Sequence, residues 1–326
     1  WQRVTPPIPG NRGYSIGYLP LDVIDGHAAW FLTPNRLDST PATAVSVFHT
    51  TDGGNSWIRL PPLHLNQFSA VAQLQFVDSL HCWMIVIRSA GMSQISFDIY
   101  RTVDGGRHWW RTLEEEDVAG NHHHIGGGLP ELDLGQTFTF SSPTSGWVSG
   151  CFCGFGASPE LFFHTTDGGH TWYPYRLTLP PTFRPANVAV GTPIFFSRRV
   201  AALPVYLLRR QGGGRLFDAY HTTDGGRSWH GTTPIPVEAD RYYDAFVDPL
   251  HGFVLDNRGL HRTANGGRSW QTSRFGFSRL NLVAIDFITP TVGFTIEGIG
   301  TTNRSRLYQT ADAGRTWHLL PASLGA

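Results

Sequence analysis

Lysine is missing from this chain of 326 residues, in which all 25 basic residues are arginine. Its absence excludes Schiff-base chemistry, a lysine general base and the lysine of a phosphate-binding loop. We attribute the bias to genomic base composition rather than to mechanism.

Cysteine is nearly as scarce, with three residues at Cys82, Cys151 and Cys153. Three cysteines are too few for a disulfide framework, and their spacing does not supply four protein ligands for zinc. One bridge stays open, because Cys82 and Cys151 each lie near the second predicted strand of adjacent repeats.

Long apolar runs and net charge are absent as well. No stretch approaches the roughly 20 apolar residues of a membrane span, and 25 basic residues balance 25 acidic ones. A neutral chain has no global field that attracts nucleic acid or an anionic membrane. We therefore expect no nucleic-acid partner, no membrane insertion by this segment, no cofactor, and a monomer. Because the sequence starts at Trp1 without an initiator Met, we expect a secreted or extracytoplasmic protein with an upstream signal or anchor.

Glycine, proline and aromatic residues are abundant, with 37 Gly, 22 Pro and 13% aromatic side chains. This composition is typical of many short strands joined by tight turns. Long helices are not expected.

A phrase of the form Thr-x-Asp-Gly-Gly-x-x-Trp recurs six times with small variations. The copies are Thr50 to Trp57, Thr102 to Trp109, Thr165 to Trp172, Thr222 to Trp229, Thr263 to Trp270 and Thr310 to Trp317. A period of a few tens of residues indicates stacked or radially arranged units that cannot bury their apolar faces alone. Short apolar runs precede and follow each copy, so the phrase is the turn of a β-hairpin.

The residue types of the phrase suit a turn. Asp accepts hydrogen bonds from turn amides, Gly supplies positive φ without a Cβ clash, and Trp packs back on the hairpin. Asn265 replaces Asp in the fifth copy and Ala313 replaces the first Gly in the sixth, while the second Gly is kept in all six. We therefore predict that the second Gly is the position that needs positive φ.

A second signal precedes each phrase: an apolar strand, a turn, Gly with an aromatic residue, and another apolar strand. Two such strands and the two of the hairpin make four per repeat, which is a propeller blade. The predicted fold is all-β, a single β-propeller domain over residues 1–326. Its blades are expected at approximately 14–61, 70–113, 136–176, 190–233, 242–273 and 281–321, with an insertion at 114–135.

The number of phrases favours six blades. The opening segment, Trp1 to Val4, looks like the strand that normally follows the phrase. It leaves two alternatives open, in which the segment pairs with the last blade or is the remnant of a seventh.

These phrases resemble Asp boxes, also called BNR repeats, which are known from sialidases, sortilin-type receptors and xyloglucan-cleaving hydrolases. The combination of an apolar strand, Gly-Trp and Thr-x-Asp-Gly-Gly-x-x-Trp is most similar to the propellers of the photosystem II assembly/stability factor family and its bacterial relatives, which are typically seven-bladed. The resemblance covers nearly the whole chain. It implies a propeller, but not one function, because this scaffold hosts unrelated activities.

The acidic residues of the phrases look catalytic in composition. In a four-stranded blade, however, the turn after the third strand lies on the face away from the usual ligand site. We therefore interpret as structural the residues Asp52, Asp104, Asp167, Asp224, Asn265 and Asp312.

The loops of the opposite face are richer in titratable groups. The ligand-binding candidates on that face are Arg12, Tyr14, His64, Arg184, Arg241, Arg274 and Arg279. The catalytic candidates are Glu238, Asp240 and Tyr242, which combine acids and a phenol within one short turn beside Arg241. A carboxylate pair with a nearby Arg suits sugar recognition or hydrolysis, and it equally suits a solvated connection.

The longest departure from the repeat runs from Arg111 to Gln136 and carries three adjacent histidines. His122 and His124 point the same way in an extended segment, which makes them the candidates for a metal. A mobile insertion is the simpler interpretation, and we expect no metal site.

The leading functional interpretation is a noncatalytic binding or assembly scaffold, which presents the face opposite the Asp boxes to a protein or glycan partner. One alternative is a carbohydrate-active enzyme, a glycoside hydrolase or polysaccharide lyase with its site in the central opening. A lectin-like glycan binder is the third. Sialidase activity is disfavoured, because the Arg-Ile-Pro motif of that family is absent and the nearest phrases are Arg3 to Pro6 and Arg184-Pro185.

Overall fold

The computed structural model describes residues 21–34, 42–68, 70–90, 95–118, 121–125, 129, 137–149, 162–181, 183, 188–208, 214–238, 243–256, 258–274, 282–298 and 305–320. Regular structure in these residues consists of 27 strands. No helix is found among the described residues, and hence none long and apolar enough to cross a membrane. The chain divides into two compact units, Trp1–Tyr175 and Arg176–Ala326.

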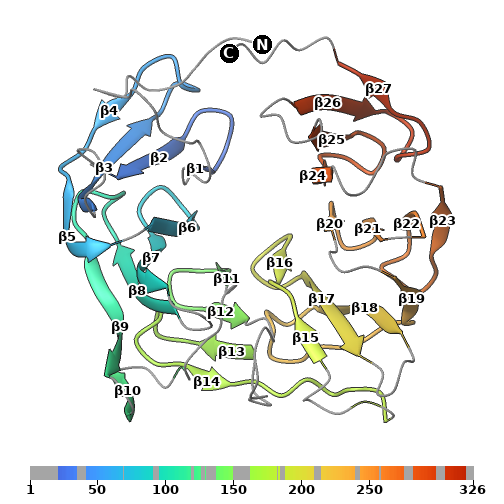
Figure 1. Ribbon diagram of the computed structural model, residues 1–326, viewed down its shortest axis with the longest axis horizontal. Helices are drawn as coiled ribbons and strands as arrows, with labels where there is room; N and C mark the ends of the chain where they lie inside the picture. Colours follow the sequence, from blue (N-terminus) through green and yellow to red (C-terminus); the bar gives the residue numbers. More distant parts are fainter. Residues whose placement is uncertain are drawn as a thin grey trace. The chain divides into compact units, whose positions relative to one another are not determined.

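The first unit holds three antiparallel sheets, which we call blades one to three (Figure 1). Blade one comprises β1 (Leu21–Val23), β2 (Ala29–Pro34), β3 (Ala42–Thr50), β4 (Ile58–Arg59) and β5 (Leu63–Phe68). Blade two comprises β6 (Ala70–Phe76), β7 (Cys82–Ala90), β8 (Ile95–Thr102), β9 (Trp110–Val118) and β10 (Asn121–Ile125). Blade three comprises β11 (Thr137–Phe140), β12 (Gly146–Ser149), β13 (Phe162–Thr165) and β14 (Tyr173–Pro174).

The second unit holds blades four to six, whose strands are also antiparallel. Blade four comprises β15 (Val188–Val190), β16 (Ile194–Phe195), β17 (Ala201–Leu208), β18 (Arg215–Thr222) and β19 (Ile235–Val237). Blade five comprises β20 (Tyr243–Phe246), β21 (Gly252–Leu255), β22 (Leu260–Thr263) and β23 (Gln271–Ser273). Blade six comprises β24 (Leu282–Phe287), β25 (Gly293–Gly298), β26 (Ser305–Thr310) and β27 (His318–Leu319).

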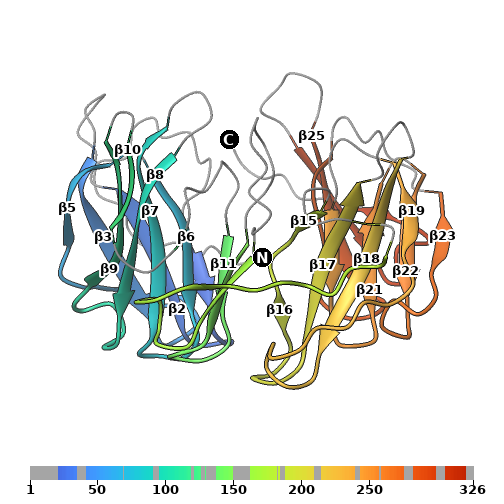
Figure 2. The same cartoon turned by 90° about the horizontal axis from the view of Figure 1, so that it is seen from below.

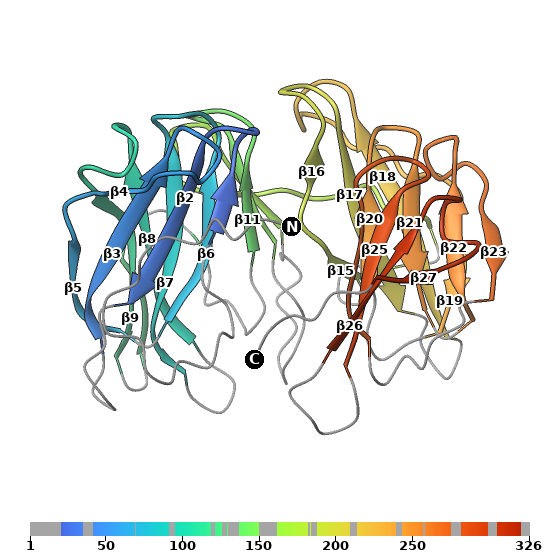
Figure 3. The ribbon, with the colours of Figure 1, turned by 90° about the horizontal axis from the view of Figure 1, so that it is seen from above.

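These six sheets confirm the predicted all-β fold, a β-propeller with six blades of at least four strands. The first strand of blade four is split, because β15 and β16 both pair with β17 (Figures 2 and 3). Two segments expected outside the blades are strands, since β5 extends blade one along β3 and β10 adds a fifth strand to blade two. The segment from Trp1 to Val4 lies outside the described residues.

The phrase forms the turn between the third and fourth strand of every blade. We call these turns the box turns and number the boxes one to six after their blades. In blade one, the Thr50 hydroxyl donates to Asp52 Oδ1 (2.8 Å) and accepts the N–H of Gly54 (2.9 Å). Asp52 in turn accepts the N–H and the hydroxyl of Ser56, at 2.9 Å and 2.6 Å. The hydroxyl of Ser56 is the largest cause that lowers the pKa of Asp52 to about 2. Three of these four contacts recur in the other five turns, namely the two of the Thr hydroxyl and the one from the N–H at the position of Ser56.

Each of these turns is bonded to the turn between the first two strands of its own blade. The N–H of Gly53 donates to the carbonyl of His27 (2.9 Å), and in blade five the N–H of Gly266 donates to the carbonyl of Leu250 (2.8 Å). Both turns therefore lie at one end of the blade, which we call the box end. The loop between the second and third strands and the connection to the next blade lie at the other, the loop end.

The prediction about glycine φ angles is wrong in one respect. Both glycines of the phrase have positive φ, and Ala313, at the first position of the last copy, adopts φ 60. Packing does not separate the two positions: a Cβ on Gly105, a first glycine, would lie 2.9 Å from the Ser79 carbonyl oxygen, whereas one on Gly169, a second glycine, would lie 3.6 Å from its nearest atom. Both positions therefore favour glycine through positive φ, and the last copy accommodates Ala at the first of them at a modest cost in backbone strain.

Aromatic residues close the seams between neighbouring blades. Trp30 of blade one stacks on Phe76 of blade two, with ring centroids 3.9 Å apart, and its indole N–H donates to the carbonyl of Gly105 (3.0 Å). Trp83 repeats both contacts one blade later, with Phe140 (3.6 Å) and the carbonyl of Gly168 (2.9 Å).

In the second unit, Phe253 of blade five stacks on Phe287 of blade six at 3.5 Å. The core thus consists mainly of inter-blade contacts.

Cys82 lies in this core. It is fully buried and is a free thiol, so the bridge to Cys151 left open by the sequence is not formed. Cys151 and Cys153 lie outside the described residues. Burial raises the pKa of the Cys82 thiol well above its ordinary value, which makes it unreactive.

Candidate functional site

A cluster of polar side chains lies at the loop end of blades four and five. It combines residues of the second strand of blade four, the connection between the blades, and the first three strands of blade five. We call it the loop-end cluster, and its members are Tyr206, Glu238, Asp244, Asp256, Arg258 and His261.

Asp256 lies at the centre of this cluster and accepts hydrogen bonds from several of its members. It follows β21 and is only 2% exposed. Its Oδ1 accepts the backbone N–H groups of Arg258 (2.7 Å) and Gly259 (3.1 Å) and the ring Nε2–H of His261 (3.0 Å). Its Oδ2 accepts the backbone N–H of Glu238 (2.6 Å). Burial raises the pKa of Asp256, but these hydrogen bonds outweigh it and leave the pKa below its ordinary value.

His261 extends the chain of contacts outward. The residue is 4% exposed, and its second ring nitrogen, Nδ1, lies 2.8 Å from the hydroxyl oxygen of Thr272 on β23. Asp256, His261 and Thr272 thus form a connected Asp–His–hydroxyl chain across three successive parts of the blade. A carboxylate on Nε2 fixes the ring orientation and its tautomer.

Glu238 and Arg258 cover the cluster on its solvent side. Arg258 donates through an Nη to Glu238 Oε1 at 2.6 Å, while 58% of the Glu238 side chain and 44% of the Arg258 side chain stay exposed. The bond to Glu238 raises the pKa of Arg258 further. A bound ligand therefore meets this ion pair before it meets Asp256.

Asp244 and Tyr206 form the other half of the cluster. The Tyr206 hydroxyl donates to Asp244 Oδ1 at 2.6 Å and joins blade four to blade five. Burial of the carboxyl group raises the pKa of Asp244 above its ordinary value, although the Tyr206 bond opposes it. Asp244 faces Val254 across the β20–β21 ladder, and Asp256 stands two residues beyond Val254. Such diagonal positions lie about 7 Å apart.

The cluster therefore contains carboxyl groups in contrasting environments. Burial favours the protonated form of Asp244, hydrogen bonding favours the ionised form of Asp256, and Glu238 stands exposed beside a guanidinium. Carboxyl groups whose pKa values are driven apart are the usual basis of acid and base roles in a site.

Of the catalytic candidates named from the sequence, the structure describes Glu238, which joins this cluster. Asp240 and Tyr242 lie outside the described residues, as do the binding candidates Arg12, Tyr14, Arg184, Arg241 and Arg279.

Two further binding candidates are described. Arg274 is exposed after β23, and Gly259 of the loop packs against its backbone. His64 lies exposed on β5 of blade one, in the other unit, and pairs with Ala44.

The metal candidates His122 and His124 lie on β10, opposite Asp117 and Glu115 of β9. Among the described residues, no group of three or more His, Cys, Asp or Glu side chains is placed to hold a metal ion.

Tyr206, Asp244, Asp256 and His261 were not predicted. One signal was available, because Asp244 interrupts the apolar run Tyr243 to Phe246, and an acid in a core strand needs a partner. The partner itself, Tyr206, is 38 residues away in the sequence. Only the packing of two blades brings it there.

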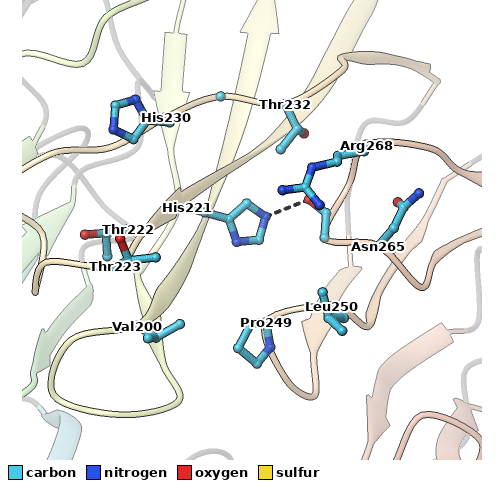
Figure 4. Close-up of a pocket in the computed structure, with 12 residues that line it drawn as sticks. Val200, His221, Thr222, Thr223, His230, Thr232, Pro249, Leu250, Asn265 and Arg268 are labelled. Carbon is cyan, nitrogen blue, oxygen red and sulfur yellow. Dashed lines mark hydrogen bonds between the residues drawn. The ribbon is translucent and has the colours of Figure 1, made fainter.

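A pocket of about 330 Å³ lies at the opposite, box end of the same two blades (Figure 4). Its walls come from the turns of both blades, including Val200, Leu250 and Arg268. His221 reaches across it, and its ring Nε2–H donates to the carbonyl of Gly266 at 2.8 Å. Burial lowers the pKa of His221, so the imidazole is neutral near pH 7.

No protein-family model matches the sequence. No curated protein matches it either. Solved structures do match. An oligogalacturonate lyase in complex with manganese aligns at a TM-score of 0.52 and 9% identity, over 82% of this chain and 74% of the lyase.

Two more matches have lower scores. An ulvan lyase of a polysaccharide lyase family aligns at a TM-score of 0.49 and 13% identity, over 90% of this chain and 78% of that one. A Hadza microbial sialidase aligns at 0.47 and 14% identity, over 86% and 67%. At these identities the likeness concerns the fold.

Proposed function

We propose that the protein is a carbohydrate-active enzyme that hydrolyses glycosidic bonds at the loop-end cluster. The observation that carries this proposal is the pair of Tyr206 and Asp244, in which a half-buried carboxyl with a raised pKa accepts a phenol hydrogen bond at 2.6 Å. The hydrogen bond occupies Oδ1 and leaves Oδ2 to carry a proton. A carboxylic acid in that state is a general acid for a leaving glycosidic oxygen.

Glu238 supplies the second carboxylate in this proposal, as the base that activates water. Arg258 holds the Glu238 carboxylate in place through the 2.6 Å contact. Asp256 and His261 act through the loop, since Asp256 binds the backbone of both Glu238 and Arg258. The oligogalacturonate lyase with a similar fold makes a glycan a reasonable substrate class, although fold alone does not determine chemistry.

The proposal is tested by incubating the purified chain with a panel of neutral and acidic polysaccharides and measuring new reducing ends. Asp244→Asn and Glu238→Gln should each lower the rate by about 10²- to 10⁴-fold. Asp286→Asn is the matched control, because Asp286 is an exposed strand carboxylate whose one hydrogen bond among the described residues comes from the neighbouring N–H of Phe287. Equal rates in all three variants, or no turnover of any polysaccharide, would overturn it. Products that carry a new carbon–carbon double bond would replace hydrolysis with elimination.

A noncatalytic scaffold, as implied by the resemblance to the photosystem II assembly factors, is the second candidate. The observation in its favour is that the carboxylates are already paired, Glu238 with Arg258 and Asp256 with four donors. Such a cluster also serves as a rigid platform for a protein or glycan. Binding of a glycan to the wild-type chain without turnover, lost in Arg258→Gln, would favour this candidate over the enzyme.

We also propose that the protein acts outside the cytoplasm, where polymeric glycans are met. Fractionation of the source cells, with immunodetection of the chain, tests this location directly. Recovery of the chain with cytoplasmic markers would contradict it.

A further inference from the structure

In the seam between blades four and five, the second strand lacks the large aromatic residue that it supplies in blades one and two, although Phe217 of the third strand stacks on Phe246. In the second strand of blades one and two, Trp30 faces His49 and Trp83 faces Arg101 across the ladder. In blade four, the residue that faces His221 at the same place is Ala202. A methyl group therefore stands where blades one and two have an indole.

The missing indole explains the contacts at this seam. In the Trp seams, the indole N–H donates to the carbonyl of the first glycine in the next box, Gly105 or Gly168. At the blade four and five seam the corresponding carbonyl is that of Gly266, and His221 donates to it instead. The smaller imidazole thus takes over the contact of the indole, while Ala202 itself is fully buried in a core cluster with Phe217 and Phe246. Both His221 and Gly266 line the box-end pocket of about 330 Å³ (Figure 4).

The charge at the mouth of this pocket is also unusual. Box five is the copy in which Asn265 replaces Asp, so its turn carries no carboxylate. Arg268 of the same turn lines the pocket, and its side chain has no hydrogen bond or ion pair with any residue in the part of the chain that the structure describes. The missing carboxylate leaves the positive charge of Arg268 uncompensated within its own turn.

Two acidic side chains adjoin the lining residues in sequence, and both are engaged elsewhere. Asp224 accepts the N–H and hydroxyl of Ser228, and Asp248 accepts the ring and backbone N–H of His251. Neither is paired with Arg268.

We propose that the box-end pocket binds a small planar aromatic carboxylate, with its ring beside the imidazole of His221 and its carboxylate on Arg268. The apolar walls at Val200, Pro249 and Leu250 suit a ring, and an apolar cavity of roughly 150 Å³ already holds benzene. The flat, neutral imidazole of His221 offers a stacking surface, and the planar guanidinium matches a carboxylate in bidentate geometry. This site lies at the other end of the blades from the loop-end cluster and is independent of the proposed function.

The test is calorimetric titration of the full chain with indole-3-acetate and benzoate, and with neutral indole as the uncharged probe. We expect saturable binding of the carboxylates with Kd of about 1 mM or tighter, and weaker binding of indole. Arg268→Gln should weaken the carboxylates by about 10-fold or more and leave indole unchanged. Arg315→Gln is the matched control: Arg315 holds the same place in the sixth box, which keeps Asp312, and it should bind like the wild type.

Leu250→Ala removes part of the apolar wall and should weaken binding of all three probes. Leu250 is exposed, so this variant should fold like the wild type. The proposal is overturned if the wild type binds none of the probes at about 10 mM, if Leu250→Ala binds all three like the wild type, or if Arg268→Gln and Arg315→Gln behave alike.

Discussion

An aspartate carboxylate accepts hydrogen bonds from backbone and hydroxyl donors in every box turn except the fifth. In the fifth turn, Asn265 shows which of these hydrogen bonds form without the charge. Asn265 accepts the N–H of Ser269 at 2.9 Å through the same oxygen position, and its amide donates to the Ser269 hydroxyl at 2.8 Å. The geometry of the turn therefore survives replacement of Asp by Asn. What the aspartates add is the stronger hydrogen bonding of an ionised acceptor.

The first prediction concerns Asp312→Asn. Hydrogen bonds from the backbone and hydroxyl of Thr316 lower the pKa of Asp312 to about 2, below the value of about 3.9 in an unfolded chain. A lowered pKa stabilises the fold above about pH 4, and this contribution is lost as the pH falls through about 2. Asp312→Asn should therefore be less stable at pH 7, by less than about 1 kcal/mol because the group is solvated, and the difference should vanish near pH 2.

Urea unfolding of both chains at several pH values between 7 and 2 measures this difference. The reverse substitution, Asn265→Asp, is the control within the same chain and should gain stability at pH 7 but not at pH 2. A difference between Asp312→Asn and wild type that does not change with pH would mean that charge is not what Asp312 contributes.

At the scale of elements, the position of the loop between β21 and β22 depends on the hydrogen bonds of a buried carboxylate, Asp256. Gly259 adopts φ 147, and a Cβ there would lie 2.1 Å from the carbonyl oxygen of Ser273. Asp256 ties this tight loop to the connection from blade four through the N–H of Glu238. The loop conformation, and with it the position of Arg258, therefore follows from satisfying one buried carboxylate.

The second prediction follows from that dependence. His261→Leu should destabilise the protein by about 2 to 3 kcal/mol, because it leaves the buried Asp256 carboxylate without its side-chain hydrogen-bond donor. Thr272→Val, which removes only the outer hydroxyl, should cost about 1 kcal/mol.

Chemical denaturation gives both values, and hydrogen exchange at the amides of Arg258 and Gly259 shows whether the loop opens. Protected amides and wild-type stability in His261→Leu would mean that the backbone donors alone hold Asp256.

The sequence predicted those elements whose causes are local. A turn such as Thr50 to Trp57 contains its own donors and acceptors, so its repetition identifies six hairpins and the four-stranded units around them. Strands β5 and β10 were missed because they extend a sheet edge in segments that lack the phrase. The contact of Tyr206 with Asp244 was missed for a different reason. It forms between two blades, and no repeated sequence pattern indicates which residues of neighbouring blades meet.

At the scale of the whole molecule, the balance of arginines and carboxylates makes the net charge depend on histidine protonation. The 25 arginines cannot lose their charge in the accessible pH range, and they balance 25 carboxylates near pH 7. The 15 histidines are therefore the groups that change the net charge as the pH falls toward 5. Not all of them respond there, because burial lowers the pKa of His164 to about 4 and also lowers that of His221.

The third prediction is that solubility is lowest near pH 7 and rises steeply toward pH 5.5, since a neutral chain associates more readily than a charged one. Polyethylene glycol precipitation at fixed protein concentration, from pH 5 to 9, measures it. Salt should flatten the profile by screening the charge gained on the acidic side. If the minimum instead lay near pH 5, or the profile were flat at low salt, most histidines would be buried and neutral. The solvated His108 and His170 of the box turns would then not be representative of the set.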